Sequence, residues 1–305
     1  MRKKTILIIL SFFSIYVFWG STYMLNKMAV MQLSPFMLAG VRFSFAGILV
    51  LIIAKLLKKS LRVSKKQLIN CTIAGFLFLA YGNGAIVWAL KYVDSGFAAL
   101  EASINPLLIL ILMRIYQKKA IKLKSIIGIA LGIVGMYLLV SQKELTFQDG
   151  STLAIIVIFT CVLCWAIGSL FIAQADLPKN FFIGTGYQML TAGIILCIAS
   201  GLFGESWIAL TDWTLKTQLS MVGLVLFGSI AAFTSFNYLL KNVSPEKVAT
   251  SAYVNPIIAL LLGWKFLEEQ ITLQTISAAV LLLLGVYFIN TKRDKISKSY
   301  NSPKR

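Results

Sequence analysis

Ten runs of roughly twenty apolar residues follow one another along this chain, with only short polar stretches between them. A run of that length crosses the ~30 Å hydrocarbon core of a bilayer as one α-helix. A helix satisfies its own backbone in hydrocarbon, and these runs lack the two-residue alternation of a membrane β-barrel. The sequence therefore predicts an all-α integral membrane protein with ten transmembrane helices. The expected spans, numbered 1 to 10, are 5–27, 34–56, 68–91, 94–115, 122–141, 150–174, 178–203, 217–240, 244–267 and 272–291.

The composition excludes several classes of protein. Of the 305 residues, 58% are apolar and only 13% are charged, which excludes a soluble globular domain and a disordered chain. There is no histidine, so His-based general bases, Ser-His-Asp triads and His-ligated metal ions are excluded. The four cysteines all lie within apolar runs, where we expect small buried side chains. We therefore expect no enzymatic activity, no metal and no cofactor.

The basic residues indicate how the chain is oriented in the membrane. Of the 29 Lys and Arg residues, 23 lie on one side of the predicted spans, in the terminal segments and alternate loops, whereas four lie on the other side. Cytoplasmic loops carry the excess of Lys and Arg, so both termini are predicted to be cytoplasmic in a multi-pass protein of the inner (plasma) membrane. The net charge of +18 is thereby a signal of topology, and it requires no nucleic-acid partner.

The chain contains an internal repeat. Trp19 in span 1 corresponds to Trp165 in span 6, 146 residues later, and Asn105-Pro106 in span 4 corresponds to Asn255-Pro256 in span 9, 150 residues later. Each half has five spans, and because five is odd the second half enters the membrane from the opposite side. Inverted repeats are typical of secondary transporters, whose substrate site lies near the bilayer midplane. The predicted parts are a first repeat at 5–141, a second repeat at 150–291 and a basic cytoplasmic tail at 292–305.

Several short motifs occur in a fixed order along both halves. They are Trp19-Gly20, Pro35, Arg42-Phe43, Asn105-Pro106, the glycines Gly128, Gly132 and Gly135, and the segment 264–268 (Trp-Lys-Phe-Leu-Glu). In this order and duplication the chain resembles the EamA family of the drug/metabolite transporter superfamily over nearly its whole length. The resemblance implies a bundle of two inverted five-helix repeats that transports small metabolites such as amino acids, often outward.

Two charged residues lie inside predicted spans. Arg42 and Glu101 are each about seven residues, or roughly 10 Å, below the outer ends of spans 2 and 4. A charge inside the bilayer is costly, so each is expected to face a partner or a cavity. One interpretation is a salt bridge that joins span 2 to span 4. The other is a site in which Arg42 binds a carboxylate and Glu101, removed from water, carries a proton.

The repeat makes this site asymmetric. Position 42 corresponds to Gln188 and position 101 to Ser251, and both of these are uncharged. We therefore expect a polar or charged end of the substrate to bind on the side of the first half, with Gln188 as a neutral contact.

The two Asn-Pro pairs fall near the midplane. Asn105 and Asn255 lie about eleven residues into spans that enter from opposite sides. A proline frees a backbone carbonyl and can kink a helix. The pairs are predicted either to be broken-helix elements that line the cavity or to be kinks that only shape the packing.

Other polar and aromatic side chains are candidates for lining the cavity. Trp19, Tyr23 and Asn26 share one face of span 1, and Trp165 repeats the start of that pattern; these rings either line the cavity or serve in packing. Asn83 in span 3 either lines the cavity or makes a hydrogen bond between helices. Lys27 is expected to extend to the outer surface.

The sequence thus predicts a secondary-active transporter. Its partners are the lipid bilayer and a small polar or amphipathic metabolite of the amino acid or amine class. No Gly-rich ATP-binding motif occurs, so protons or exchange are expected to supply the energy. Export is the leading direction, and uptake by a permease of the same fold is the alternative. A membrane sensor or assembly protein without transport activity is less favoured because no residues remain for an output domain.

Overall fold

The computed structural model describes residues 2–118, 123–141, 150–172, 174–243, 248 and 251–290. All regular secondary structure within these residues is helical. The predicted tail at 292–305 lies outside the described residues.

The first half consists of five spans, three of which are built from more than one helical segment. Span 1 is α1 (Arg2–Phe13), the π-helical η1 (Ser14–Phe18) and α2 (Trp19–Val30). Span 2 is α3 (Pro35–Leu56), and span 3 is α4 (Lys65–Gly75), the π-helical η2 (Phe76–Ala80) and α5 (Gly84–Ala89). Span 4 is α6 (Ser95–Ala102) and α7 (Asn105–Gln117), and span 5 is α8 (Leu123–Val140).

The second half also consists of five spans, of which only span 8 is divided into several helical segments within the described residues. Span 6 is α10 (Ser151–Ile172), span 7 is α11 (Phe181–Leu202), and the short η3 (Leu210–Asp212) follows. Span 8 is α12 (Leu215–Gly223), the π-helical η4 (Leu224–Ala231) and α13 (Ala232–Asn242). Span 9 is α15 (Ser251–Leu267) and span 10 is α16 (Leu273–Asn290).

The lengths and composition of these segments confirm the predicted membrane helices. Within the described ranges, seven helical segments are long and apolar enough to cross a membrane, and three shorter apolar helices complete the ten. Large apolar side chains such as Ile52, Ile156 and Leu261 are exposed on the outside of the bundle. In a bilayer, lipid tails cover such surface at no cost, because they are as apolar as the side chains.

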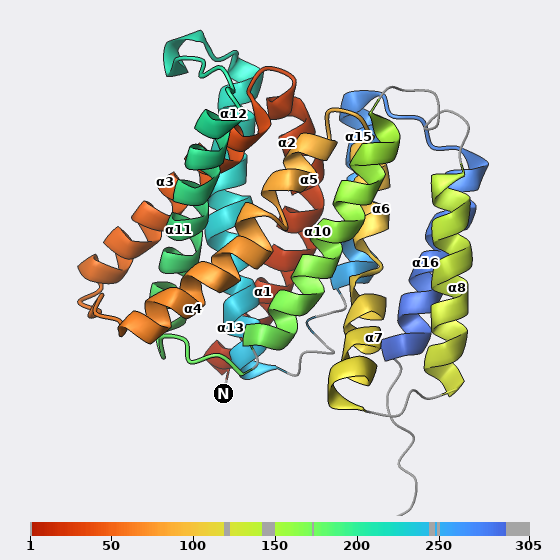
Figure 1. Ribbon diagram of the computed structural model, residues 1–305, viewed down its shortest axis with the longest axis horizontal. Coiled ribbons are helices and arrows are strands. Elements are labelled where there is room, and N and C mark those ends of the chain that lie inside the picture. Colours follow the sequence, from red (N-terminus) through yellow and green to blue (C-terminus); the bar gives the residue numbers. More distant parts are fainter. Residues whose placement is uncertain are drawn as a thin grey trace, which may run out of the picture.

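The two halves pack against each other through repeat-related helices. α3 packs along its counterpart α11, and α8 packs along its counterpart α16. Figure 1 shows the pair α8 and α16 together at one end of the bundle, with α3 and α11 toward the other end. Glycines allow the close approach: a Cβ added to Gly40 would lie 2.8 Å from Cys197 Sγ, and one added to Gly193 would overlap the backbone nitrogen of Ser44.

Two glutamates cap the N-termini of α3 and α6. Glu205, after α11, accepts hydrogen bonds from the backbone nitrogens of Phe36 (3.0 Å) and Met37 (2.8 Å) at the start of α3. Glu269, after α15, accepts from the Ser95 backbone nitrogen (2.7 Å) at the start of α6. The first nitrogens of a helix have no helical acceptor, and a carboxylate there also interacts favourably with the helix dipole. Each cap joins a loop of the second half to a span of the first half.

The two Asn-Pro spans differ. In span 4 the helix is interrupted by a turn at Ser103 and Ile104, and α7 begins at Asn105 with Pro106 in its first turn. In span 9, α15 continues through Pro256 without interruption. The expected break is therefore present in span 4 and absent in span 9, and the part of that interpretation in which the pairs line a cavity stays a prediction. A proline in the first turn removes a nitrogen that has no helical acceptor anyway, whereas inside a helix it removes a hydrogen bond.

Candidate functional site

Arg42 is the centre of a buried polar group. Its side chain is 2% exposed and projects from α3 about two turns after the start of that helix. Nε donates to Ser229 Oγ (2.8 Å), and Nη1 donates to Oδ1 of Asn26 (3.2 Å) and of Asn83 (3.4 Å). Spans 1, 2, 3 and 8 therefore meet at one guanidinium group. These partners are all neutral, and no described residue accepts a hydrogen bond from Nη2.

The repeat explains two of these partners. Asn83 and Ser229 are 146 residues apart, the same offset that relates the two tryptophans, so they are equivalent positions of spans 3 and 8. The Arg42 guanidinium lies between this equivalent pair. Gly228, next to Ser229, makes room for it, because a Cβ on Gly228 would lie 3.1 Å from Arg42 Nη2.

The predicted aromatic residues of spans 1 and 6 lie beside this group. Trp19 Nε1 donates to the Gly228 carbonyl (3.2 Å), and Trp165 Nε1 donates to the Gly82 carbonyl (3.1 Å). Gly82 and Gly228 are again 146 residues apart, so the two bonds are repeat-related. The Trp19 and Trp165 rings contact each other edge to face with centroids 5.9 Å apart. Phe78, Phe233 and Phe236 complete the aromatic cluster.

Glu101 does not pair with Arg42. The Glu101 side chain is 1% exposed in α6, and its Oε2 has no hydrogen-bond partner among the described residues. α6 packs against α2, which carries Tyr23, and against α10, which carries Cys161, so spans 1 and 6 flank the helix that carries this carboxyl group. The salt-bridge interpretation is therefore wrong for this conformation. Equal depth in two spans does not make two side chains neighbours, because the faces they occupy depend on packing.

Gln188 lies on α11 at the position equivalent to Arg42. It is 3% exposed, and its Oε1 has no hydrogen-bond partner among the described residues. The structure therefore places a partnered cation on α3 and an unpartnered amide oxygen on α11.

The two asparagines of the Asn-Pro pairs have different environments. With its nitrogen oriented toward span 1, the Asn255 amide donates to the carbonyls of Tyr16 (2.9 Å) and Ile15 (3.0 Å) in η1. The Oδ1 of Asn105 is shielded and has no partner among the described residues. Asn255 therefore links spans 9 and 1, whereas Asn105 makes no equivalent bond to span 6 here.

Lys27 lies in the last turn of α2, at the end of span 1. Nζ donates to the Val93 carbonyl (2.7 Å), just before the start of α6. Lys27 therefore joins span 1 to the loop between spans 3 and 4, in the same region where Glu269 caps α6.

Sequence reasoning missed the role of Ser229. Asn26 was recognised only as part of an aromatic face, and Ser229 was not singled out. The repeat contained the signal for Ser229, because applying the offset of 146 residues to Asn83 leads to it. Nothing comparable identifies Asn26, whose counterpart at that offset is the apolar Ile172.

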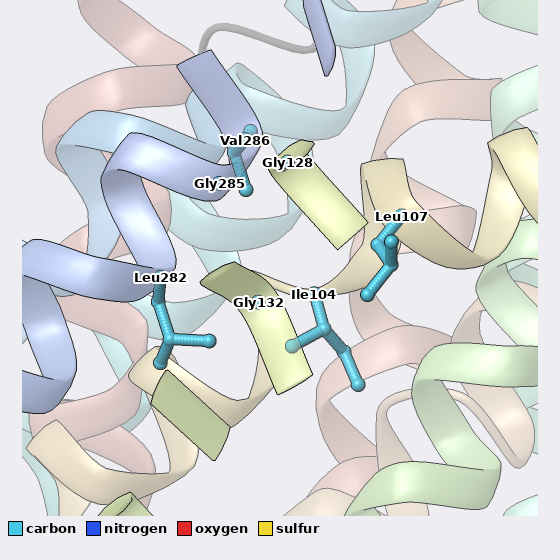
Figure 2. Close-up of a pocket in the computed structure, with 7 residues that line it drawn as sticks. All are labelled: Ile104, Leu107, Gly128, Gly132, Leu282, Gly285 and Val286. Atoms are coloured by element: carbon cyan, nitrogen blue, oxygen red, sulfur yellow. The ribbon is translucent and has the colours of Figure 1, made fainter. Parts of the chain in front are cut away.

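A narrow pocket lies apart from the Arg42 group. Figure 2 shows it between α7, α8 and α16, and it has no space for a water molecule. It is lined by Ile104, Leu107, Gly128, Gly132, Leu282, Gly285 and Val286. We regard it as part of the close packing of the glycine faces of α8 and α16.

Two inverted five-helix repeats around buried polar side chains define a membrane transporter. The model of the EamA-like transporter family matches residues 6–141 and 152–291, and the chain belongs to this family. It is similar to the "Uncharacterized inner membrane transporter YedA" of Escherichia coli K12, with 37% identity over 289 residues and 92% of each chain covered. It is also similar to the "Uncharacterized transporter YyaM" of Bacillus subtilis, with 26% identity over 295 residues, covering 94% of this chain and 93% of the relative. A crystal structure of a protein with 17% identity has the same fold, with a TM-score of 0.67 over 93% of this chain and 96% of that chain.

Proposed function

We propose that this membrane transporter is a secondary-active exporter of a small polar or amphipathic metabolite of the amino acid or amine class, which it moves by alternating access. The observation that carries this proposal is Arg42, a buried guanidinium with three neutral partners and an Nη2 without an acceptor among the described residues. A guanidinium removed from water is costly unless a counter-charge is supplied. A carboxylate on the substrate supplies that charge.

The surroundings of Arg42 suit such a substrate. A planar guanidinium binds a carboxylate through two parallel hydrogen bonds, which fixes orientation as well as adding attraction. The repeat-related Trp19 and Trp165 each donate a hydrogen bond to a glycine carbonyl. The glycine that Trp19 meets precedes Ser229, and the glycine that Trp165 meets precedes Asn83. The two tryptophans offer apolar surface next to the cation, so a molecule with a carboxylate and a small apolar or aromatic part fits best.

Glu101 is the proposed proton carrier. Its shielded Oε2 without a described partner, on a helix that packs against α2 and α10, supports the role of a protonatable group in a transport pathway. Because the chain has no ATP-binding motif, coupling to protons or to exchange supplies the energy. The distribution of Lys and Arg supports cytoplasmic termini in the inner membrane.

A metabolite-toxicity screen tests this function and its direction together. Cells with and without the gene are exposed to high concentrations of single amino acids and amines, and growth is compared. We expect the gene to relieve the toxicity of a subset of carboxylate-bearing compounds, and everted membrane vesicles to accumulate the same compounds. Arg42→Lys is the matched control, because it keeps the charge and loses the planar fork. Increased toxicity of that subset would instead favour uptake, and an unchanged profile for every compound would contradict the proposal.

A further inference from the structure

The two halves have equivalent hydrogen bonds at their two tryptophans. Trp19 donates to Gly228 and Trp165 donates to Gly82, and both donors and acceptors are related by the same offset of 146 residues. Equivalent residues therefore occupy equivalent places in this part of the two halves. Where equivalent residues behave differently, the difference lies in the local conformation of the two halves.

Such a difference occurs where spans 1 and 9 meet. The helix of span 1 is π-helical at η1, and Asn255 donates to the Ile15 and Tyr16 carbonyls there. A π-helical turn departs from the regular i to i−4 bonding, and its carbonyls can accept from a side chain. Span 9 itself is a regular helix through Pro256.

The equivalent place, where spans 6 and 4 meet, has the reverse arrangement: the first helix is regular and the span with the Asn-Pro pair is broken. Cys161 and Val162, the counterparts of Ile15 and Tyr16, lie within the regular helix α10. Asn105, the counterpart of Asn255, has an unpartnered Oδ1, and span 4 is broken just before it at Ser103 and Ile104. Asn255 is thus hydrogen-bonded to span 1 within a continuous helix, whereas the Asn105 side chain makes no such bond to a described residue and lies beside a break.

We infer that Asn105 and Asn255 form a reciprocal switch. In the second state, the Asn105 amide donates to the Cys161 and Val162 carbonyls, a π-helical turn forms in span 6, and span 4 closes into a continuous helix. At the same time Asn255 leaves η1, and span 9 opens at Tyr253 and Val254, the counterparts of the present break. The inference rests on the proposed transport function, because it states how the two halves exchange conformations during alternating access.

The prolines keep the free-energy cost of this exchange small. Pro106 and Pro256 have no backbone N–H, so each span already lacks one helical hydrogen bond at the place where it opens. In each state one asparagine amide gains carbonyl partners and the other loses them, so the number of hydrogen bonds is conserved. Two states that differ little in free energy can both be populated, as a carrier requires.

A disulfide-trapping experiment measures the population of the described state. A Cβ added to Gly20 would lie 2.8 Å from Ile258 Cβ, so Gly20→Cys with Ile258→Cys places two thiols together across spans 1 and 9. The mean Cβ separation in disulfides is about 3.8 Å, so the spans must part by about 1 Å. The native cysteines are replaced, and the initial rate of cross-linking is measured in the full chain in membranes without added substrate.

The switch predicts opposite effects of two similar substitutions. Asn255→Ala should lower the cross-linking rate about five- to tenfold, because it removes bonds of the described state. Adding Asn105→Ala should return the rate toward that of the parent, because it removes the matching bonds of the second state. Asn242→Ala is the matched control, because among the described residues its amide donates to the Tyr238 carbonyl, one turn earlier in α13, and it should leave the rate unchanged. A further fall in the double variant would overturn the switch.

Transport provides a second measurement that does not need the cysteine pair. Each single alanine substitution should slow net transport, and the double variant should be faster than the slower single variant because the balance between states is restored. A double variant slower than both single variants would indicate two independent contacts and contradict the switch. Because cross-linking needs no substrate, failure of the switch is distinguishable from failure of the proposed substrate class.

Discussion

The two halves share a scaffold and differ in the chemistry placed on it. Along α3 and α11, glycines at repeat-related positions let the helices touch, and along α8 and α16 the same holds. α3 carries Arg42, whereas its counterpart on α11 is Gln188; span 4 carries Glu101, whereas its counterpart in span 9 is Ser251. The comparison teaches that both copies of the repeat have the close backbone contacts, whereas the two charged groups buried within the spans, Arg42 and Glu101, both belong to the first copy.

At the ends of the spans, too, the backbone conformation is repeated in the two halves while the side-chain charge differs. Lys58 and Gly204 are 146 residues apart, Lys118 and Glu268 are 150 apart, and all four have left-handed backbone conformations at helix C-termini. The residues that follow Gly204 and Glu268 are the glutamates that cap α3 and α6, whereas Lys59 follows Lys58. The local backbone is repeated, but the charge at these helix ends is basic in the first half, at Lys58 and Lys59, and acidic in the second half, at Glu205 and Glu269.

The largest effects are expected from neutralising the charges that distinguish the halves. Arg42→Gln should lower substrate affinity by roughly 10- to 100-fold, because it removes a charge-assisted pair with the substrate carboxylate. Glu101→Gln should remove the pH dependence of transport and retain substrate exchange, because a permanently neutral side chain cannot carry a proton. Binding and pH-resolved transport in reconstituted vesicles measure both effects.

The combined variant, Arg42→Gln with Glu101→Gln, sharpens this comparison. If the two residues served only as a structural pair, removing both charges would leave no orphan charge and would restore transport. We expect the combined variant to be present in the membrane and inactive in net transport. Wild-type, pH-dependent transport by the combined variant would contradict the assignment of the site to the first half.

A second, smaller effect is expected from disturbing the shared scaffold. A Cβ on Gly285 would lie 2.7 Å from the Gly128 carbonyl oxygen, and one on Gly135 would lie 3.0 Å from the Leu282 backbone nitrogen. Gly285→Ala and Gly135→Ala should each lower the free energy of unfolding by about 1–3 kcal/mol, because backbone atoms cannot move aside cheaply. Thermal unfolding in detergent measures the change.

Gly201→Ala is the matched control for these glycines. Nothing lies within 4 Å of a Cβ added there, so the substitution should be neutral or stabilise slightly through helix propensity. Equal losses in the free energy of unfolding for the Gly285 and Gly135 variants would support a symmetric scaffold. A large difference between the two losses would contradict it.

The smallest effect is expected at a residue that positions Arg42. Ser229→Ala removes the 2.8 Å hydrogen bond to Nε and should weaken substrate binding about three- to fivefold, with Ser229→Thr retaining most of the affinity. Ser220→Ala is the control in the same span, because within the described part of the chain the Ser220 hydroxyl donates to the Met28 sulfur, at a distance of 3.8 Å, and not to Arg42. Equal affinities for the Ser229 and Ser220 variants would show that Ser229 does not position the guanidinium.

Much of the fold followed from local patterns. The apolar runs predicted all ten membrane segments, and the offsets between Trp19 and Trp165 and between the Asn-Pro pairs predicted the two halves. The candidate site followed only in part. Arg42 and Glu101 were recognised because charges inside apolar runs are rare, but Ser229 was not, because a serine in a membrane helix is common and its partner is 187 residues away in the chain.

The sequence by itself determined the number of spans, the repeat and the residues able to carry charge, because hydrophobicity, length and periodicity are local properties of the chain. Only the tertiary structure decided that Arg42 bonds to Asn26, Asn83 and Ser229 and not to Glu101. It also decided that one Asn-Pro span is broken while the other is continuous. Depth along a span follows from counting residues, but the face of a helix that meets a neighbour depends on how all ten spans pack. The same dipeptide can therefore adopt two conformations in one molecule.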